Sequence, residues 1–87
     1  MFIILVYDFG QKRVGKALKI CRKYLHWVQN SVFEGRISQA NLVKIKGELT
    51  SLVKPEEDSV IIYTFRSKKY SNREIIGLEK GEVNFMI

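Results

Sequence analysis

Hydrophobic side chains form one uninterrupted run near the start of the chain, over residues 2–7. The run consists of aliphatic and aromatic side chains without the polar gaps that a surface helix shows. It is therefore predicted to form a strand that is buried on both faces of a sheet. Asp8 and Gly10 follow, and because both residue types favour turns, the strand is expected to end there.

The spacing of hydrophobic residues changes to three and four from Gln11 onward, which predicts an amphipathic helix. Its apolar side and its basic side are separate, so one face is expected to pack on the sheet while the other faces solvent. The apolar side is formed by Val14, Ala17, Leu18, Cys21 and Tyr24 with Leu25, and the basic side by Lys12, Lys16, Lys19 and Lys23.

Polar and apolar residues alternate over residues 26–36, a pattern that is typical of half-buried strands. We predict two short strands there, joined near Asn30 and Ser31. Ser38 is placed to cap a second helix, and Pro55 is expected to follow its end. The buried stripe of this second helix is predicted to be Leu42, Ile45, Leu49, Leu52 and Val53.

A second strand that is apolar on both faces is predicted over residues 59–65. The acidic residues 56–58 before it are expected to form a solvated turn. Residues 66–73 after it are rich in serine, lysine and arginine, and they are predicted to form a basic loop. Residues 82–87 are predicted to form a last short strand.

The order strand, helix, strand, strand, helix, strand predicts an α+β fold, the ferredoxin-like βαββαβ sandwich, with an additional C-terminal strand. Residues 1–87 are expected to form a single domain. Two helices cover only one sheet face in this fold, whereas residues 2–7 and 59–65 are apolar on both sides. A symmetric homodimer packed through the sheet face would cover the second face, and we expect residues 82–87 at that interface.

The charge of the chain indicates what kind of partner it binds. The formal net charge is +6, and no carboxylate lies between Phe9 and Phe33. Such a distribution favours an anionic partner, and nucleic acid is the commonest one. An ordinary solvated helix face is the alternative for the lysines. A single cysteine excludes an internal disulfide, and the apolar start is too short to span a membrane. We therefore expect a cytoplasmic protein that does not contact membranes.

Asp8 is the candidate metal ligand of the chain, because it stands at a strand end in basic surroundings. Magnesium typically takes one or two protein carboxylates together with waters and a substrate phosphate. Two-fold symmetry would bring the Asp8 side chains of both subunits together at a Mg²⁺ ion or another divalent cation. The alternative is that Asp8 forms an Asx turn or caps the following helix.

The remaining chemistry-bearing residues carry weaker signals. His26 and Cys21 are the only histidine and the only cysteine, which is too few ligands for a zinc site. His26 is interpreted as a surface histidine rather than a general base, and Cys21 as a core residue. Tyr7, Trp27 and Phe33 are candidates for stacking on bases, but sheet core or dimer interface is the favoured interpretation.

Three stretches of the sequence closely resemble the CRISPR-associated protein 2 family. They are Val-Tyr-Asp at residues 6–8, Trp-Val-Gln-Asn-Ser-Val-Phe-Glu-Gly at residues 27–35, and Asp-Ser-Val-Ile-Ile-Tyr at residues 58–63. The resemblance implies a ferredoxin-like homodimer that acts in spacer acquisition. It would bridge copies of the CRISPR-associated protein 1 integrase and hold incoming duplex DNA.

The resemblance also implies an activity, because many family members are described as metal-dependent endonucleases acting on single-stranded RNA or duplex DNA. The catalytic and metal-binding aspartate of the family falls on Asp8, and Arg13 matches a basic position of the family at the start of the first helix. Tyr7, Ser31 and Phe33 match the motif near the dimer axis. Some nuclease-active members carry a basic residue at the position of Trp27, and this sequence departs from them there. The basic residues expected to contact nucleic acid are Arg13, Lys12, Lys16, Lys19 and Lys23.

Several functions remain open on this basis. The chain is either a metal-dependent phosphodiesterase centred on Asp8 or a scaffold that binds duplex DNA and the integrase without chemistry of its own. An RNA-cleaving toxin of similar fold is a further alternative. A regulatory module that binds a small metabolite has the least support, because no matching pocket motif accompanies the basic residues.

Overall fold

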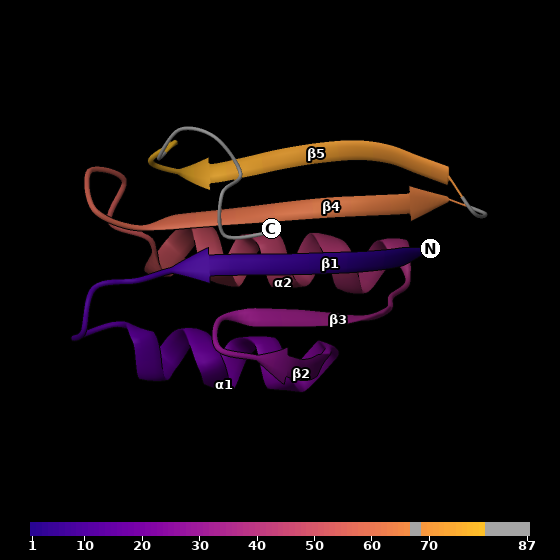
Figure 1. Cartoon of the computed structure of the whole chain (residues 1–87). Coiled ribbons are helices and arrows are strands. Elements are labelled where there is room, and N and C mark those ends of the chain that lie inside the picture. Colours follow the sequence, from indigo (N-terminus) through magenta and orange to yellow (C-terminus); the bar gives the residue numbers. More distant parts are fainter. Residues whose placement is uncertain (67–68, 80–87) are drawn as a thin grey trace.

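The computed structural model describes residues 1–66 and 69–79, and that part of the chain contains two helices and five strands. Figure 1 shows how these elements are arranged. The elements are β1 (Phe2–Asp8), α1 (Val14–Tyr24), β2 (His26–Gln29), β3 (Val32–Arg36), α2 (Gln39–Leu52), β4 (Ser59–Arg66) and β5 (Lys69–Gly77).

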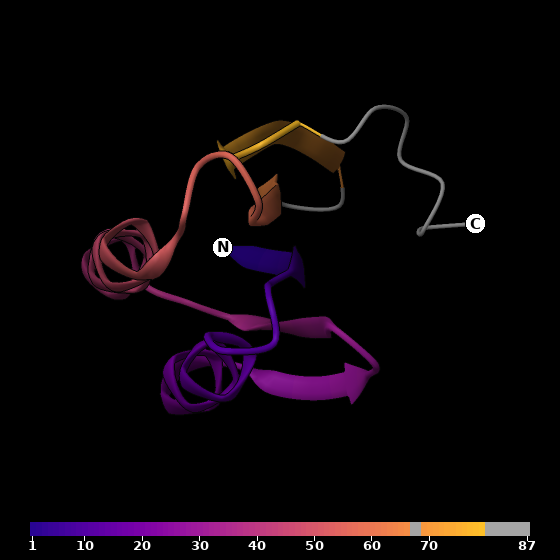
Figure 2. The ribbon, with the colours of Figure 1, turned by 90° about the vertical axis from the view of Figure 1, so that its left-hand side faces the viewer.

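The five strands form one sheet in the order β2-β3-β1-β4-β5, and every neighbouring pair is antiparallel. Both helices lie on the same face of this sheet, as the strands and the two coils in Figure 2 show, while the described residues place no helix on the other face. The topology is the ferredoxin-like βαββαβ sandwich with one additional strand at its edge. The predicted fold class is therefore confirmed.

The hydrophobic core lies between the sheet and the two helices. Alternate residues of β1 and β4 point into it, because successive side chains of a strand face opposite sides. α1 contributes Ala17 and Cys21, and α2 contributes a stripe at three- and four-residue spacing, as predicted. The buried cluster contains Ile3, Leu5, Tyr7, Phe9, Ala17, Cys21, Leu25, Phe33, Ile37, Leu42, Ile45, Leu49, Val60 and Ile62.

The sheet face that carries no helix in the described residues, here called the outer face, is only partly buried. Phe2 and Ile4 of β1 remain half-exposed on this face, whereas Val6 and its partner Ile61 on β4 are buried. Tyr63 and Phe65 lie opposite Ile4 and Phe2 on β4 and are half-exposed too. Within one chain the helices bury only one face of β1, as expected for two helices packed on the same side, and the predicted burial of the second face against a partner stays a prediction.

The hairpin between β2 and β3 follows the predicted pattern, with its turn at Asn30 and Ser31. Asn30 adopts a left-handed backbone conformation with φ of 44°, which asparagine tolerates better than most residues. Trp27 donates a hydrogen bond from its indole Nε1 to the carbonyl oxygen of Asn30 at 2.9 Å. Ser31 in turn accepts a backbone hydrogen bond from Tyr7 at 3.1 Å, which joins the turn to β1.

The helix ends agree with the sequence for α2 and differ for α1. Ser38 caps α2 as predicted, because its Oγ accepts a hydrogen bond from the backbone N–H of Asn41 at 3.1 Å. α1 begins at Val14 instead of Gln11, and the side chain of its N-cap residue, Arg13, makes no capping bond. Its guanidinium points elsewhere, to carboxylates of the turn before β4.

The segment after β4 differs from the prediction, because residues 69–77 form β5 rather than continuing a basic loop. β5 pairs with β4 over its length, with one irregularity beside Phe65. Pairing with the edge of β4 satisfies backbone donors and acceptors and outweighs the low strand propensity of the polar residues. The predicted terminal strand at residues 82–87 lies outside the described residues.

The acidic turn before β4 also differs from the prediction. Glu56 and Glu57 are exposed, but the Asp58 side chain is completely buried. A charged carboxylate is found in such a position only when it is paired and hydrogen-bonded. The expectation of a fully solvated turn is therefore wrong at Asp58, and its partners define the first feature of the site.

Candidate functional site

Asp58 connects two loops that lie at one end of the sheet. Its carboxylate accepts hydrogen bonds from the backbone N–H groups of Gly10 and Lys54, both at 2.8 Å. Arg13 adds a bidentate contact, with Nε 2.5 Å from Oδ2 and Nη2 3.0 Å from Oδ1. The loop between β1 and α1 is thereby fixed to the turn between α2 and β4.

The electrostatics of this cluster follow from those contacts. The hydrogen bond from Arg13 holds the pKa of Asp58 well below its usual range, against the opposing effect of burial, and the two backbone N–H groups act in the same direction. The same hydrogen bond raises the pKa of Arg13. Glu57 contacts Arg13 at 3.2 Å and Lys54 at 2.9 Å, and these hydrogen bonds lower its pKa. The cluster is ionised at neutral pH.

Arg13, one of the predicted nucleic-acid contacts, is therefore committed to two carboxylates of its own chain. Its position supports the loop that follows Asp8 rather than presenting a guanidinium to solvent. The sequence offered no local signal for this arrangement, because Arg13 and Asp58 are 45 residues apart. Their pairing is a product of the fold.

Asp8 stands at the end of β1, opposite Ser59 of β4, and its side chain is exposed. Because neighbouring residues of a strand face opposite sides, Asp8 points away from the face that Tyr7 shares with the helices. The described residues contain no group of three or more histidine, cysteine, aspartate or glutamate side chains that would hold a metal ion. β1 itself contributes one carboxylate, Asp8.

The predicted basic residues of α1 and the preceding turn separate into two groups. Lys12, Lys16 and Lys19 are exposed, and among the described residues none of them forms an ion pair. Lys23 bonds to Glu48 of α2, which also accepts a hydrogen bond from Tyr24. The first group is therefore available to an anionic ligand, whereas Lys23 helps to hold the two helices together.

Tyr7 and Phe33 are core residues on the helix-facing side of the sheet. Their rings stack with centroids 5.8 Å apart, and Phe9 meets Tyr7 edge-on at 5.5 Å. Phe33 is fully buried and Tyr7 nearly so, in agreement with the interpretation as sheet core. Burial is the main reason that the pKa of the Tyr7 hydroxyl is raised, and the nearby positive charge of Arg22 partly opposes it.

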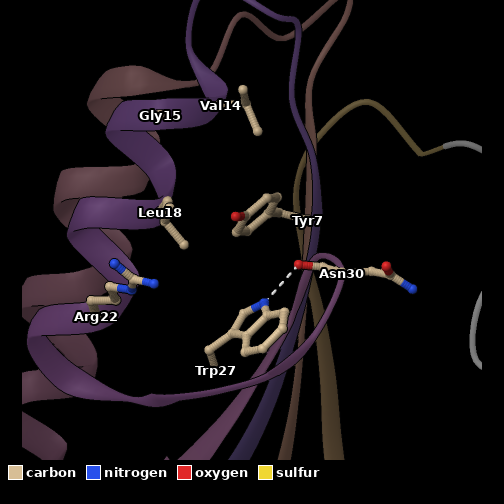
Figure 3. A pocket seen from close by; sticks show the side chains of 7 residues that line it. All are labelled: Tyr7, Val14, Gly15, Leu18, Arg22, Trp27 and Asn30. Carbon is tan, nitrogen blue, oxygen red and sulfur yellow. Dashed lines mark hydrogen bonds between the residues drawn. The ribbon is translucent and has the colours of Figure 1, made fainter.

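Trp27 is not part of the sheet core, because 55% of its surface is exposed, and the alternative that it lies at a dimer interface stays a prediction. It borders a cleft of about 320 Å³ between α1 and the β2–β3 turn, which the sequence patterns did not predict. Figure 3 shows Leu18 and Arg22 on the α1 side of this cleft and Tyr7 with Trp27 across from them. The full lining is Tyr7, Val14, Gly15, Leu18, Arg22, Trp27 and Asn30, hereafter the Trp27 cleft.

Cys21 and His26 take no part in a site among the described residues. Cys21 is fully buried in the core, and burial raises the pKa of its thiol to about 12. A thiol in that state is not a nucleophile at neutral pH, so its prediction as a core residue is confirmed. His26 is exposed at the start of β2, as a surface histidine would be.

Fold and site together define a small, basic α+β protein of ferredoxin-like topology with an exposed carboxylate at the end of its first strand. The family model described as CRISPR associated protein Cas2 matches residues 1–73. The chain belongs to this family, and the predicted resemblance is confirmed.

Individual relatives support the same assignment. A protein of Thermotoga maritima named CRISPR-associated endoribonuclease Cas2 is 51% identical over 86 residues, which cover 99% of both chains. Another of that name, from Dictyoglomus turgidum, is 49% identical over 82 residues and 94% of both chains. A crystal structure of Streptococcus pyogenes Cas2 matches with a TM-score of 0.69 and 33% identity, over 76% of this chain and 87% of that one.

α1 and α2 are the helices of the described residues. Neither of them is long and apolar enough to cross a bilayer.

Proposed function

We propose that the protein is a metal-dependent endoribonuclease of a CRISPR system, and that it acts as a symmetric homodimer in which Asp8 of both subunits holds Mg²⁺. The observation that carries this proposal is the exposed Asp8 carboxylate at the end of β1. The names of the relatives, which read CRISPR-associated endoribonuclease Cas2, point to RNA as the substrate.

The need for a dimer follows from the ligand count. Asp8 of one chain supplies one carboxylate, and a second copy related by two-fold symmetry would supply the other. The outer sheet face offers a surface for this pairing, because Phe2, Ile4, Tyr63 and Phe65 are all half-exposed there. Apolar side chains gathered on an uncovered sheet face favour burial against a partner.

Mg²⁺ fits this position, since it binds through one or two carboxylates and fills its other positions with water and phosphate oxygens. When bound, the ion would lower the pKa of a water molecule and neutralise charge that develops on the phosphate. Asp8 would hold the ion and so fix the position of that water molecule. Lys12, Lys16 and Lys19 follow Asp8 closely in sequence and lie exposed, so they are suited to hold the phosphate backbone.

Arg13 and Asp58 contribute by position rather than by contact with substrate. Their bidentate pair fixes the loop between Asp8 and α1. A rigid loop keeps Asp8 and the first lysines of the basic face in a constant arrangement, which catalysis by orientation requires.

A second candidate function is a scaffold for spacer acquisition that binds duplex DNA and the CRISPR-associated protein 1 integrase without cleaving RNA. The observation that favours it is that the described residues contain no group of three or more potential metal-ligating side chains, so a metal site at Asp8 would depend on dimer geometry. An exposed row of lysines binds duplex and single-stranded phosphates alike.

Cleavage of labelled single-stranded RNA and duplex DNA in Mg²⁺ tests the proposal. Asp8→Asn should reduce RNA cleavage by about 100-fold or more, because the metal loses both carboxylates while the shape of the side chain is kept. Glu56→Gln is the matched control, since Glu56 is an exposed carboxylate in the turn before β4, and it should cleave like the wild type.

Both variants are first shown by light scattering to have the same oligomeric state as the wild type. Equal cleavage by Asp8→Asn and wild type would rule out Asp8 as the centre of the reaction. Absence of cleavage in all three proteins, with duplex DNA still bound, would favour the scaffold.

A further inference from the structure

The Trp27 cleft is pre-organised for a flat ligand. The indole of Trp27 is held by its 2.9 Å hydrogen bond to the Asn30 carbonyl, and Asn30 itself is fixed in the left-handed region of the turn. Trp27 therefore keeps its ring exposed in one orientation at the base of the cleft (Figure 3). An exposed, immobilised aromatic ring loses little conformational entropy when a ligand stacks on it.

The α1 side of the cleft supplies apolar contact and positive charge. Val14, Leu18 and Arg22 are spaced by four residues and share one face of the helix. Gly15 lies on the same face and leaves open space, because a Cβ atom built there would meet no atom within 4 Å. The exposed Arg22 forms no ion pair among the described residues, so its guanidinium is available to an anion.

Charge around the cleft selects an anionic ligand. Neither α1 nor β2 contains an acidic residue, whereas Lys16, Lys19 and Arg22 are exposed along α1. A volume of about 320 Å³ is at the lower end of the range for ligand sites, which suits one planar group better than a peptide segment. A planar aromatic group attached to a chain of negative charges is the chemistry of a nucleotide in a single strand.

We propose that the Trp27 cleft binds one unpaired nucleobase of single-stranded RNA, with the base stacked on Trp27 and an adjacent phosphate at Arg22. The inference rests on the proposed function and deepens it by naming a substrate subsite. Tyr7, which lines the cleft, directly precedes Asp8, so this subsite lies at the same end of β1 as the proposed reaction centre. A double helix cannot use the site, because its bases are stacked and paired.

The single tryptophan of the chain makes the test direct, since its fluorescence reports on the cleft alone. The dimeric wild-type protein is titrated with a short oligouridylate in EDTA, so that metal-dependent cleavage does not interfere. Stacking on Trp27 should quench the fluorescence in a saturable manner. An abasic oligonucleotide of the same length and charge should leave the fluorescence nearly unchanged, although it can still bind the lysines.

A matched pair of glycine variants separates the cleft from the stability of the helices. Gly15→Leu fills the open space at the α1 wall and should weaken oligouridylate binding roughly 10-fold, the order expected for the loss of one base stack. Gly47→Leu makes the same change on α2, where a Cβ atom also meets nothing within 4 Å, and should bind like the wild type. Both changes favour the helical state, so neither is expected to unfold the protein.

Three results would show that the Trp27 cleft does not bind a base. Equal quenching by the abasic strand, equal quenching by duplex RNA, or unchanged binding by Gly15→Leu would overturn the base subsite. The deoxyuridine oligomer offers the same base on another sugar, and equal binding of both oligomers would overturn the assignment to RNA. Binding is measured in EDTA and cleavage in Mg²⁺, so a failure of the nuclease proposal shows in cleavage and leaves this result intact.

Discussion

At the scale of single residues, Asp58 shows how a buried charge is tolerated. Its carboxylate is completely buried, yet two backbone N–H groups and the Arg13 guanidinium satisfy both oxygens. A buried ion pair contributes little net stability relative to apolar packing, but breaking one partner leaves an uncompensated charge. The cluster therefore fixes the geometry of two loops more than it adds to the free energy of unfolding.

Removal of the Asp58 charge should destabilise the folded protein. Asp58→Asn is expected to lower the free energy of unfolding by about 3 kcal/mol, because Arg13 loses its main partner and the new amide NH2 group faces backbone donors. Urea denaturation of wild type and variant measures the difference. Glu57→Gln, which removes the exposed carboxylate beside it, should lower the free energy of unfolding much less than Asp58→Asn does, because solvent screens an exposed ion pair. Equal losses in the two variants would contradict the role assigned to Asp58.

The same contacts predict a dependence on pH. Arg13 lowers the pKa of Asp58 in the folded state, so the stability it contributes is fully present above the ordinary carboxyl pKa of about 4. That contribution is lost as the pH falls through this value toward the lower folded-state pKa, because the unfolded chain takes up the proton first. Urea unfolding at neutral and acid pH should show a steeper loss for wild type than for Asp58→Asn. Parallel losses would count against the mechanism.

At the scale of elements, the end of β5 depends on a glycine. Gly77 has φ of +90°, and a Cβ atom built on it would lie 2.3 Å from the carbonyl oxygen of Asp58. Leu78 donates a backbone hydrogen bond to that same oxygen at 2.8 Å. The close approach couples the edge strand to the turn that carries the buried carboxylate.

We expect Gly77→Ala to lower the free energy of unfolding by more than about 1 kcal/mol, because both the backbone conformation and the nearby carbonyl oppose a side chain. Gly47→Ala on α2 is the matched control. It should raise the free energy of unfolding by about 0.5–1 kcal/mol, since alanine is the better helix former and the position is open. Thermal unfolding of the two variants gives opposite shifts if this interpretation is correct.

At the scale of the whole molecule, the two faces of the sheet differ in how far they are buried. The helices bury the face that carries Phe33 and Ile62, whereas Phe2 and Ile4 on the other face are only half-buried. This asymmetry underlies the proposed homodimer, because a partner chain is the simplest means of removing these side chains from water.

Ile4→Lys should therefore shift the protein from dimer to monomer, since a charge at the centre of an apolar interface is left without a partner. Light scattering over a range of protein concentrations measures the state. Val43→Lys is the matched control, because Val43 is 62% exposed on α2, on the helix-covered side. A variant Ile4→Lys that remains as dimeric as the control would place the interface elsewhere.

The sequence by itself determined the parts of the protein that depend on neighbouring residues. The spacing of Ala17 with Cys21, and of Leu42 with Ile45 and Leu49, predicted two amphipathic helices because helical periodicity is a local property. Ser38 as a cap followed from chemistry within four residues. The order of elements then left the ferredoxin-like topology as the natural arrangement, and the resemblance to the family followed from three short stretches of sequence.

Only the tertiary structure decided the features that join distant residues. The burial of Asp58 depends on Arg13 and Gly10, more than forty residues earlier, so no local pattern distinguishes it from its exposed neighbours Glu56 and Glu57. β5 exists because β4 offers an edge that must be paired, although the first part of β5 is rich in polar and charged residues. The Trp27 cleft likewise forms where α1 meets the β2–β3 turn. The physical reason is common to all three, because long-range contacts outweigh local preference.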